Sequence, residues 1–435
     1  MNSKRRVLII SYYWPPSGGA GVQRWLKFVK YLREFGLEPV IYTPENPEFP
    51  SLDESLFKDI PEGIEIVRTP IWEPYRFYKK LIGAGKNERI NAGFLSEKKR
   101  PGMAEKFSIW LRGNFFIPDA RKFWIRPSVN FLVKYLAQKP VDAIVSTGPP
   151  HSMHMIALGV KKKTGIPWLA DFRDPWTNID FYHELMLSGW ADKKHHRQEL
   201  SVLKEADEVV VISRSMRTDF TGILNRDYTV ITNGYDMDDV SNLETVPDKK
   251  FSISHIGTMV KTRNPEALWQ ALSKEAGQNP VFAANLELKL VGSVDYSVNE
   301  SLDRAGLRQF VKLVSYLPHD EVVKVQQQSQ VLLLLINDTP NAKVILPGKF
   351  FEYMASRRPI LCIGPKDGDA ARVIAETGSG MVVEKDDALG LQQAVQELFS
   401  RFLSGDTGMK SHNIGNYSRR ELTAALAGRL NHIIR

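Results

Sequence analysis

Short apolar runs recur along the chain and alternate with segments of helical spacing. The runs are four to six residues long and mostly apolar, with many β-branched residues, which is typical of strands buried on both faces of a parallel sheet. In the first half of the chain the predicted strands are Val7–Ser11, Pro39–Thr43, Ile64–Thr69, Asp142–Thr147, Pro167–Ala170, Glu208–Ser213 and Tyr228–Thr232. In the second half they are Phe251–Ile256, Leu286–Val291, Val311–Tyr316, Val331–Ile336, Pro359–Ile363 and Gly380–Glu384.

Helical patterns separate these runs. After the first run, apolar residues recur at helical spacing from Val22 to Phe35, and Gly36 is placed to end the helix. Further helices are predicted at Pro265–Lys274, His319–Gln328, Gly348–Ser356, Asp369–Glu376, Ala388–Phe402 and Ser418–Ile434. Strands that alternate with helices in this way indicate the α/β class with doubly wound, Rossmann-like sheets.

The polar segment 242–250, which contains Pro247, separates the two series. We therefore predict a first domain over residues 1–241, a linker over 242–250 and a second domain over 251–417. The last segment, 418–435, is expected to pack back on the first domain as a helix. In such folds ligands bind at the carboxyl ends of the strands, so we expect a site in a cleft between the domains.

Composition narrows the cellular setting. The chain has 435 residues, and its single cysteine, Cys362, cannot form an intramolecular disulfide, which fits a reducing compartment. The basic start is followed by an apolar run too short for a signal peptide, and no stretch is long and apolar enough to span a bilayer. We therefore expect a cytoplasmic protein, soluble or attached to the inner face of the membrane.

The formal net charge of +8 is concentrated in residues 75–126, which carry 13 Lys/Arg and 4 Asp/Glu among many aromatic side chains. Basic residues interleaved with aromatic ones suit an anionic membrane surface or a lipid phosphate. They also suit single-stranded nucleic acid. A third interpretation is a solvated, irregular insert whose aromatic rings pack onto the domain.

A glycine-rich loop follows the first predicted strand and leads into its helix. Gly18 and Gly19 let the backbone approach a phosphate at the helix amino end. The sequence from Gly19 begins a dinucleotide fingerprint, but Arg24 occupies its last glycine position. Because Glu45 lies near the place of the expected ribose-binding acid, a nicotinamide enzyme stays an alternative, as does a simple tight turn.

Polar residues also follow two neighbouring strands in the first half. His151 comes after one strand, and Asp171, Arg173 and Asp174 leave the next. The carboxyl ends of adjacent parallel strands meet at one edge of the sheet, so these groups are predicted to share a rim. The structural alternative is that Asp171 pairs with Arg173 while His151 caps a helix.

Two segments of the second half are suited to a phosphorylated ligand. Gly257 and Thr258 form a turn after the first strand of that domain, and Arg263 offers a planar fork for phosphate oxygens. Pro347 and Gly348 open a helix in the segment Leu346–Pro359, Lys349 follows them, and Glu352 lies one turn further on. Its carboxylate can accept hydrogen bonds from both hydroxyls of a ribose.

Taken together, these motifs resemble the retaining glycosyltransferases of family four, which have the GT-B fold, and a bacterial surface-polysaccharide branch of that family. The residues that carry the resemblance are Gly18-Gly19, Ser213-Arg214-Ser215, Asn233-Gly234-Tyr235-Asp236, Gly257-Thr258 with Arg263, and Pro347–Pro359. Stretches 116–124 and 170–176 carry the likeness to the branch. The family motif has two acids eight positions apart. Glu352 matches the second, but Val344 stands where the first is expected.

The resemblance implies a nucleotide-sugar donor bound mainly to the second domain, and a lipid-linked or glycan acceptor bound to the first. Glu352 would bind the donor ribose, Thr258 and Arg263 the diphosphate, and Leu317 would lie against the base. Gly18, Gly19, Gly257 and Gly348 complete the expected donor contacts. We expect His151, Asp174, Arg263 and Lys349 to serve catalysis, with Lys349 compensating for the acid missing at Val344.

No metal ion or other cofactor is expected. Asp236-Met237-Asp238 and Asp367-Gly368-Asp369 have the form of the Asp-x-Asp metal motif of another transferase fold, but no further metal ligands accompany them. Two other functions stay open. One is a nucleotide-sugar epimerase of the same fold, against which the basic aromatic segment argues. The other is a non-catalytic module that binds membrane or nucleic acid, against which the crowded polar rim argues.

Overall fold

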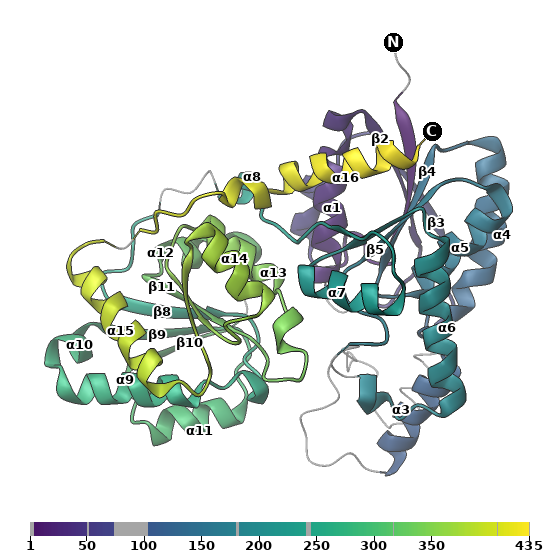
Figure 1. Ribbon diagram of the computed structural model, residues 1–435. Coiled ribbons are helices and arrows are strands. Elements are labelled where there is room, and N and C mark those ends of the chain that lie inside the picture. Colours follow the sequence, from purple (N-terminus) through teal and green to yellow (C-terminus); the bar gives the residue numbers. More distant parts are fainter. Residues whose placement is uncertain are drawn as a thin grey trace. The chain divides into compact units, whose positions relative to one another are not determined.

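The computed structural model describes residues 4–49, 52–73, 103–179, 182–240, 245–315, 317–406 and 408–434. The chain forms two compact units. The first consists of Met1–Thr232 together with Leu422–Arg435, and the second of Asn233–Glu421. Each unit is a parallel sheet with helices on both faces (Figure 1).

The described part of the first unit has a seven-stranded sheet in the order β3-β2-β1-β4-β5-β6-β7, and every pair is parallel. The strands are β1 (Arg5–Ile10), β2 (Leu37–Pro44), β3 (Glu65–Thr69), β4 (Ala143–Gly148), β5 (Trp168–Phe172), β6 (Glu208–Val211) and β7 (Thr229–Val230). The strand order reverses between β1 and β4. Loops that leave these two strands therefore turn to opposite faces and leave room for a ligand between them.

Alternate residues of these strands feed two separate cores, as the period of two in a strand requires. Val7 and Ile9 pack under α1 (Ala20–Leu32) and α16 (Arg419–Ile433). Leu8 and Ile10 belong to the opposite core. The helices of that core are α4 (Lys122–Gln138), α5 (Ser152–Thr164), α6 (Gly189–Glu205) and α7 (Arg214–Ile223). The end of α1 agrees with the sequence, since a short 3-10 turn leads into Gly36 at φ +76°.

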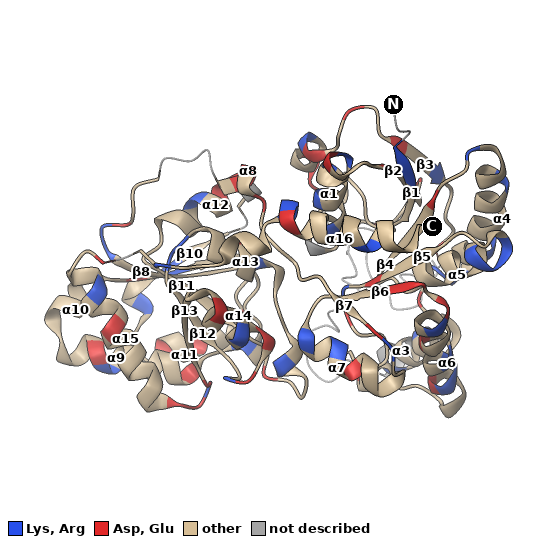
Figure 2. Cartoon of the chain, turned by 45° about the horizontal axis from the view of Figure 1, so that its top comes forward, with Lys and Arg blue, Asp and Glu red and all other residues tan. Residues whose placement is uncertain are grey.

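The second unit has, within its described residues, a six-stranded parallel sheet in the order β10-β9-β8-β11-β12-β13. The strands are β8 (Phe251–Ile256), β9 (Leu286–Val291), β10 (Val311–Val314), β11 (Val331–Leu335), β12 (Ile360–Ile363) and β13 (Gly380–Val383). Here the order reverses between β8 and β11. Charged residues lie mostly on helices and loops, and the strands of both sheets carry few of them (Figure 2).

Helices cover both faces of the second sheet. One core includes residues of α9 (Glu266–Gln278), α10 (Pro280–Asn285), α11 (Tyr296–Arg304) and α15 (Ala388–Leu403). The opposite core includes residues of α8 (Met237–Val240), α12 (His319–Gln328), α13 (Gly348–Ala355) and α14 (Asp369–Thr377). The predicted fold class, two doubly wound domains in series, is therefore confirmed.

The basic aromatic segment is only partly described, because residues 75–102 lie outside the described residues. From residue 103 onward the segment is regular structure, with α3 (Met103–Phe115) leading to the start of α4. Trp124 belongs to the core: it stacks on Tyr42 with ring centroids 5.0 Å apart, and its Nε1 donates to Thr69 Oγ1 at 3.0 Å. An irregular insert is thus the wrong description of residues 103–126. None of the helices in the described ranges is long and apolar enough to cross a membrane.

Helix α16 gives the fold its first test. Leu426 is fully buried against the sheet of the first unit. Leu426→Ala should lower the free energy of unfolding of that unit by about 2–5 kcal/mol, because it removes buried methyl groups and leaves a cavity. Leu200→Ala on α6, whose leucine is 41% exposed, is the matched control and should cost far less. Urea titration measures both, and equal losses would show that α16 does not complete this core.

Candidate functional site

In the second unit the strand order reverses between β8 and β11, and the loops that leave these two strands begin at the same edge of the sheet. Gly257 directly follows β8 and has φ +111°, which side chains of L residues rarely adopt. A Cβ atom on Gly257 would lie 3.7 Å from Nζ of Lys349. The glycine therefore permits the turn and leaves the amine close to the backbone.

Arg263 joins the two loops. Its Nη1 donates to the carbonyl oxygen of Thr258 at 3.1 Å, and its Nε donates to Oδ1 of Asn337, which follows β11. The guanidinium is half-buried, whereas Thr258 and Lys261 are exposed. Arg263 is thus fixed at the point of strand reversal, with a planar charged group at the carboxyl ends of both strands.

Lys349, the second residue of α13, reaches back to the end of β8. Its Nζ donates to the carbonyl oxygen of Ile256 at 2.9 Å and lies 3.3 Å from Nε2 of His255. Burial and the positive charge of Arg263 lower the pKa of Lys349 to about 7, against the raising effect of Glu352. At neutral pH a positive charge on this amine is easily gained and costly to keep without an anion.

Glu352 lies on the same helix and is half-buried. One carboxylate oxygen, Oε2, accepts a hydrogen bond from Nε2 of Gln326 on α12 at 3.2 Å. The next residue, Tyr353, is fully buried, and its hydroxyl oxygen accepts from the backbone N–H of Ile256 at 2.9 Å. Tyr353 thereby fixes the second half of α13, where Glu352 lies, to the end of β8.

The remaining predicted donor contacts occupy the same unit. Gly348 is the first residue of α13, and Pro347 precedes it without a capping side-chain hydrogen bond. Leu317 is half-buried and leads into α12, while its neighbour Tyr316 lies outside the described residues. Val344 is a half-buried residue of a 3-10 turn, so an apolar side chain stands where the family has its first acid.

The polar rim of the first unit is arranged differently from either sequence interpretation. Asp171 is fully buried and pairs with Arg24 of α1 (Nη2–Oδ1 2.7 Å), not with Arg173. Its carboxylate also accepts from Trp25 Nε1 at 2.7 Å and Thr147 Oγ1 at 3.0 Å. Burial alone would raise the pKa of Asp171, but the Arg24 charge and these hydrogen bonds hold it below its ordinary value. Asp171 is therefore a structural anion that secures α1.

Arg173 is also used by the backbone. Its Nη1 donates to the carbonyl oxygen of Gly21 at 2.6 Å, and its Nη2 donates to that of Pro149. Arg173 thus ties the first turn of α1 to the loop after β4, and Asp174 follows it as a half-buried residue. Gly18 and Gly19 precede α1, with Gly19 at φ +91°.

Buried histidines form a cluster at the carboxyl end of β4. His151 is 8% exposed and stacks face to face on Trp176, with centroids 4.4 Å apart. It precedes α5 but makes no capping hydrogen bond, so the capping interpretation is wrong. Nδ1 of His151 is buried and has no hydrogen-bond partner among the described residues. Trp176 in turn donates from Nε1 to Nδ1 of His195 at 3.0 Å.

These histidines are neutral at pH 7. Burial is the main cause that keeps the pKa of His151 well below its ordinary value, and the positive charge of Arg173 acts in the same direction. Burial also lowers the pKa of His154 to about 3 and that of His195 to about 4. The ring nitrogens of this cluster can therefore exchange hydrogen bonds with hydroxyl groups, but they offer no positive charge.

The two Asp-x-Asp sequences are used locally. Asp236 is 4% exposed, and its Oδ1 accepts from the backbone N–H of Asp238 at 3.2 Å at the start of α8. Asp367 pairs with Lys343 at 2.5 Å, and Asp369 with Arg372 at 2.6 Å. In the part of the chain that the structure describes, no group of three or more His, Cys, Asp or Glu residues is arranged to hold a metal ion.

Comparison with known families accounts for both units. Residues 18–234 match the glycosyl transferase 4-like domain, and residues 250–401 match the glycosyl transferases group 1 domain. Both halves of the chain are glycosyltransferase domains. These matches support a GT-B glycosyltransferase. No curated protein sequence matches the chain.

Solved structures of low sequence identity share this fold over nearly the whole length of the glycosyltransferase. They include WaaG, a glycosyltransferase involved in lipopolysaccharide biosynthesis (12% identity, TM-score 0.57, 98% of this chain and 99% of that one). A trehalose-phosphate synthase from Burkholderia vietnamiensis has 10% identity and a TM-score of 0.59 over 100% and 98% of the chains. A UDP-N-acetylglucosamine 2-epimerase from Listeria monocytogenes, described as putative, has 12% identity and a TM-score of 0.57 over 99% and 97%.

Several residues of these sites were missed by the sequence analysis. His255, Gln326 and Asn337 contact predicted donor residues, and Trp176 lies against His151. Only His255 had a usable signal, since a large polar side chain in a strand predicted to be buried requires partners. The others contact the site through tertiary packing, which spacing along the chain does not reveal.

The buried histidines predict acid sensitivity. Below about pH 6.5 the unfolded chain binds protons that folded His154 and His195 do not accept until pH 3 to 4. The free energy of unfolding should therefore fall as pH drops through this window, by up to about 1.4 kcal/mol per pH unit for each histidine. His154→Asn keeps a partner for Ser146 and should reduce that slope.

The measurement is urea unfolding at a series of pH values from 7 to 4. His183→Asn removes an imidazole whose side chain is 73% exposed and serves as the control, with the wild-type slope expected. An unchanged slope in His154→Asn would contradict the assignment of a depressed pKa to this buried ring.

Proposed function

We propose that this glycosyltransferase moves a sugar from a nucleotide-sugar donor onto a lipid-linked or polysaccharide acceptor, with retention of the anomeric configuration, in cell-surface polysaccharide biosynthesis. The observation that carries the proposal is the arrangement of Arg263, Lys349 and Glu352 around the Gly257 turn. Two basic groups and one carboxylate there match the two parts of a nucleotide sugar, its anionic diphosphate and its ribose.

Lys349 and Arg263 are proposed to bind the diphosphate and to stabilise it as it departs. Both side chains are held by backbone or amide oxygens, so they are oriented before the donor arrives. Positive groups fixed where negative charge develops stabilise a transition state without reorganisation. This role needs no metal ion, and we propose that none is essential.

Glu352 is proposed to accept hydrogen bonds from the ribose, while Leu317 lies against the base and Gly348 brings the amino end of α13 to the phosphates. Gly18 and Gly19 are proposed to contribute from the first unit. There His151 and Asp174 would orient the hydroxyl groups of the acceptor or sugar. The buried, unpartnered Nδ1 of His151 supports this part of the proposal.

A nucleotide-sugar epimerase is the second candidate. Its support is the fold shared with the Listeria monocytogenes protein, which is described as a putative epimerase. The two activities differ in whether an acceptor is consumed. The purified protein should be incubated with radiolabelled nucleotide sugars, with and without membrane extract, in the presence of a strong chelator. Label transferred to lipid or glycan would support the proposal. An acceptor-independent change of the sugar would support the epimerase, and no reaction with any donor would support a binding module.

Glu352→Gln tests the ribose assignment. A hydrogen bond to a charged group contributes about 1.5–3 kcal/mol, so the variant should bind its nucleotide roughly ten- to hundredfold more weakly. Calorimetric titration with the nucleotide that binds the wild type measures this change. Glu397→Gln makes the same chemical change at an exposed position of α15 and should leave the affinity as it is. Equal affinities of the two variants would remove Glu352 from the ribose site.

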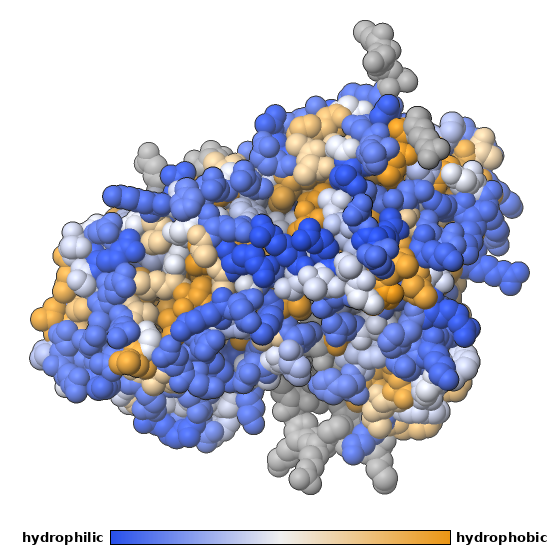
Figure 3. Space-filling view, in the orientation of Figure 1, coloured by the Kyte–Doolittle hydropathy of each residue, from blue (hydrophilic) through white to orange (hydrophobic). Residues whose placement is uncertain are grey.

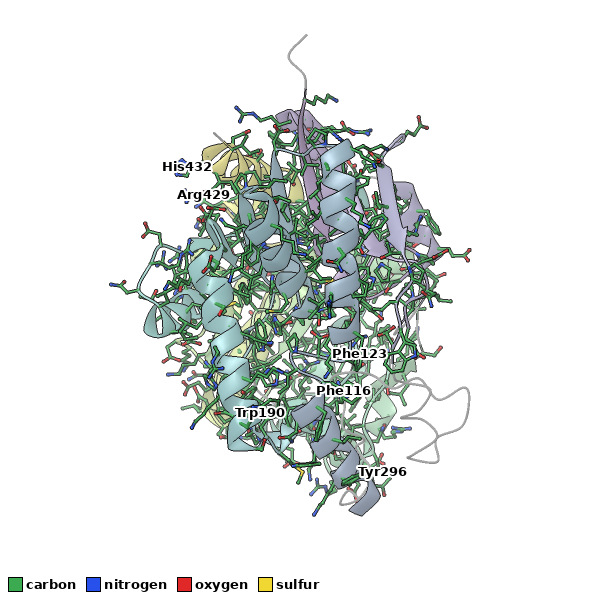
Figure 4. The ribbon with its side chains drawn as sticks, turned by 90° about the vertical axis from the view of Figure 1, so that its right-hand side faces the viewer. Phe116, Phe123, Trp190, Tyr296, Arg429 and His432 are labelled. Atoms are coloured by element: carbon green, nitrogen blue, oxygen red, sulfur yellow. The ribbon has the colours of Figure 1, made fainter. Side chains whose placement is uncertain are left out.

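Attachment to the inner face of the cytoplasmic membrane is the second part of the proposal. Exposed aromatic side chains gather at one end of the first unit, on α3, the start of α4 and the start of α6: Phe107, Trp110, Phe115, Phe123 and Trp190. Figure 4 shows Phe116 beside Phe123 and Trp190 at the lower end of α6, and apolar atoms gather over α3 and this end of α6 in Figure 3.

Lysines accompany these rings. Nζ of Lys122 lies 4.9 Å from the Phe123 ring centroid, and Nζ of Lys194 lies 4.8 Å from that of Trp190. Lys106 is exposed on α3, and the basic residues Lys98, Lys99 and Arg100 lie outside the described residues. Aromatic rings favour the headgroup level of a bilayer and lysines favour anionic lipids, so this aromatic–basic surface suits a lipid-linked acceptor.

The membrane proposal predicts binding that depends on anionic lipid and weakens with salt. Each basic residue near such a surface contributes about 1 kcal/mol, so Lys106→Gln with Lys194→Gln should weaken binding roughly thirtyfold. Co-sedimentation with phosphatidylglycerol vesicles measures the affinity. Lys312→Gln with Lys324→Gln removes two exposed lysines of the second unit as control. Equal binding of both variants, or no binding by wild type, would contradict the proposal.

A further inference from the structure

His255 is an unusual residue for its position. It lies in β8 and is 1% exposed, two residues before the Gly257 turn. Its Nδ1 lies 3.0 Å from the carbonyl oxygen of Leu333 on the adjacent strand β11. A carbonyl oxygen can only accept, so Nδ1 must carry the proton. In a neutral ring this leaves Nε2 with a lone pair, and Nε2 is therefore the hydrogen-bond acceptor.

That lone pair is directed to Lys349, whose Nζ lies 3.3 Å from Nε2. The second acceptor for Nζ is the carbonyl oxygen of Ile256 at 2.9 Å. Both acceptors come from the last two residues of β8, next to the glycine whose Cβ position is 3.7 Å from Nζ. The amine is thus held by two hydrogen bonds at the turn, and the third N–H of its ammonium form stays available for an incoming ligand.

The charges around this pair decide what the imidazole does. Lys349 and Arg263 face His255, and Arg263 and Glu352 face Lys349. Burial, reinforced by Lys349 and Arg263, outweighs the raising effect of the backbone at Leu333 and Thr258 and keeps the pKa of His255 well below its ordinary value, so the ring is neutral and accepts from Lys349. A neutral acceptor orients the amine and leaves its positive charge in place, whereas a carboxylate in the same position would neutralise that charge. The positive charge thus remains available for a phosphate anion.

We propose that His255 is a positioning residue for sugar transfer: its neutral imidazole holds the Lys349 amine at the Gly257 turn, where the amine meets the donor diphosphate. This inference rests on the donor site proposed above. It also gives a reason for a histidine within a fully buried strand. The strand keeps its packing, and the ring spans from the β11 backbone to the first residues of α13.

Two substitutions by amide side chains test the two hydrogen bonds of the His255 ring one at a time. His255→Asn places its amide near the position of Nδ1, so it keeps the bond to Leu333 and loses the acceptor for Lys349. His255→Gln extends to the position of Nε2 and keeps that acceptor. We expect His255→Asn to lower kcat roughly ten- to hundredfold with a smaller change in the donor KM, because a misplaced charge acts on the transition state. His255→Gln should retain most of the wild-type kcat.

The experiment measures kcat and KM with the donor found in the transfer assay, and calorimetric affinity for inorganic pyrophosphate. Lys349→Met and the double variant His255→Asn/Lys349→Met complete a cycle. If His255 acts through Lys349, the double variant should be no worse than Lys349→Met alone. Additive losses, or equal losses in the Asn and Gln variants, would overturn the positioning role. Far-ultraviolet circular dichroism and thermal melting identify a variant that is unfolded. If His255→Asn is, the pair His255→Gln and Lys349→Met decides, and a Gln variant as impaired as Lys349→Met overturns the role.

The two proposals fail differently. If Lys349→Met and Arg263→Ala both keep full activity and pyrophosphate affinity, the donor site itself is wrong. If both are impaired while His255→Asn behaves as wild type, the donor site stands and only the role of His255 is wrong.

Discussion

Reversal of strand order in a parallel sheet is the constraint on which the candidate sites depend. All helices of such a sheet must cover its two faces, so the loops after the two strands at the reversal leave in opposite directions. In the first unit this happens between β1 and β4, and in the second between β8 and β11. Arg263 and Lys349 lie at the reversal in the second unit, and His151 in the first unit follows β4, one of the two strands at its reversal.

In the second unit, positively charged side chains lie at the point where the strand order reverses. Arg263 spans from the loop after β8 to Asn337 after β11, and Lys349 returns from α13 to the end of β8. In the contacts described above both cations donate to uncharged oxygen or nitrogen atoms, and these contacts orient their charge. Keeping such groups partly buried opposes stability. A binding site for an anion gives a physical reason for them.

Much of the fold could be predicted from the sequence, because continuous apolar runs such as Val331–Ile336 have few alternatives to a buried parallel strand. The helices α3 and α4 were missed, since the basic and aromatic composition of their segment hides the helical period. In the second unit, the places of Gly257 in the turn after β8 and of Lys349 and Glu352 on α13 could be predicted from local spacing along the chain. The ion pairs of the first unit could not be predicted in this way. Asp171 pairs with Arg24, 147 residues away, and not with its sequence neighbour Arg173. Proximity in sequence is a poor guide where a helix packs on a distant strand.

The two units consequently differ in the chemistry they leave available. In the first unit, Asp171 and Arg173 form hydrogen bonds that hold α1 and the loop after β4. The other polar side chains at this edge include a cluster of neutral, buried histidines. Neutral rings exchange hydrogen bonds with hydroxyl groups and have little attraction for phosphate. In the second unit, the basic groups Arg263 and Lys349 attract phosphate more strongly than hydroxyl groups. An acceptor sugar is rich in hydroxyl groups and a departing nucleotide is anionic, so electrostatics supports the proposed assignment of the acceptor to the first unit and the donor to the second.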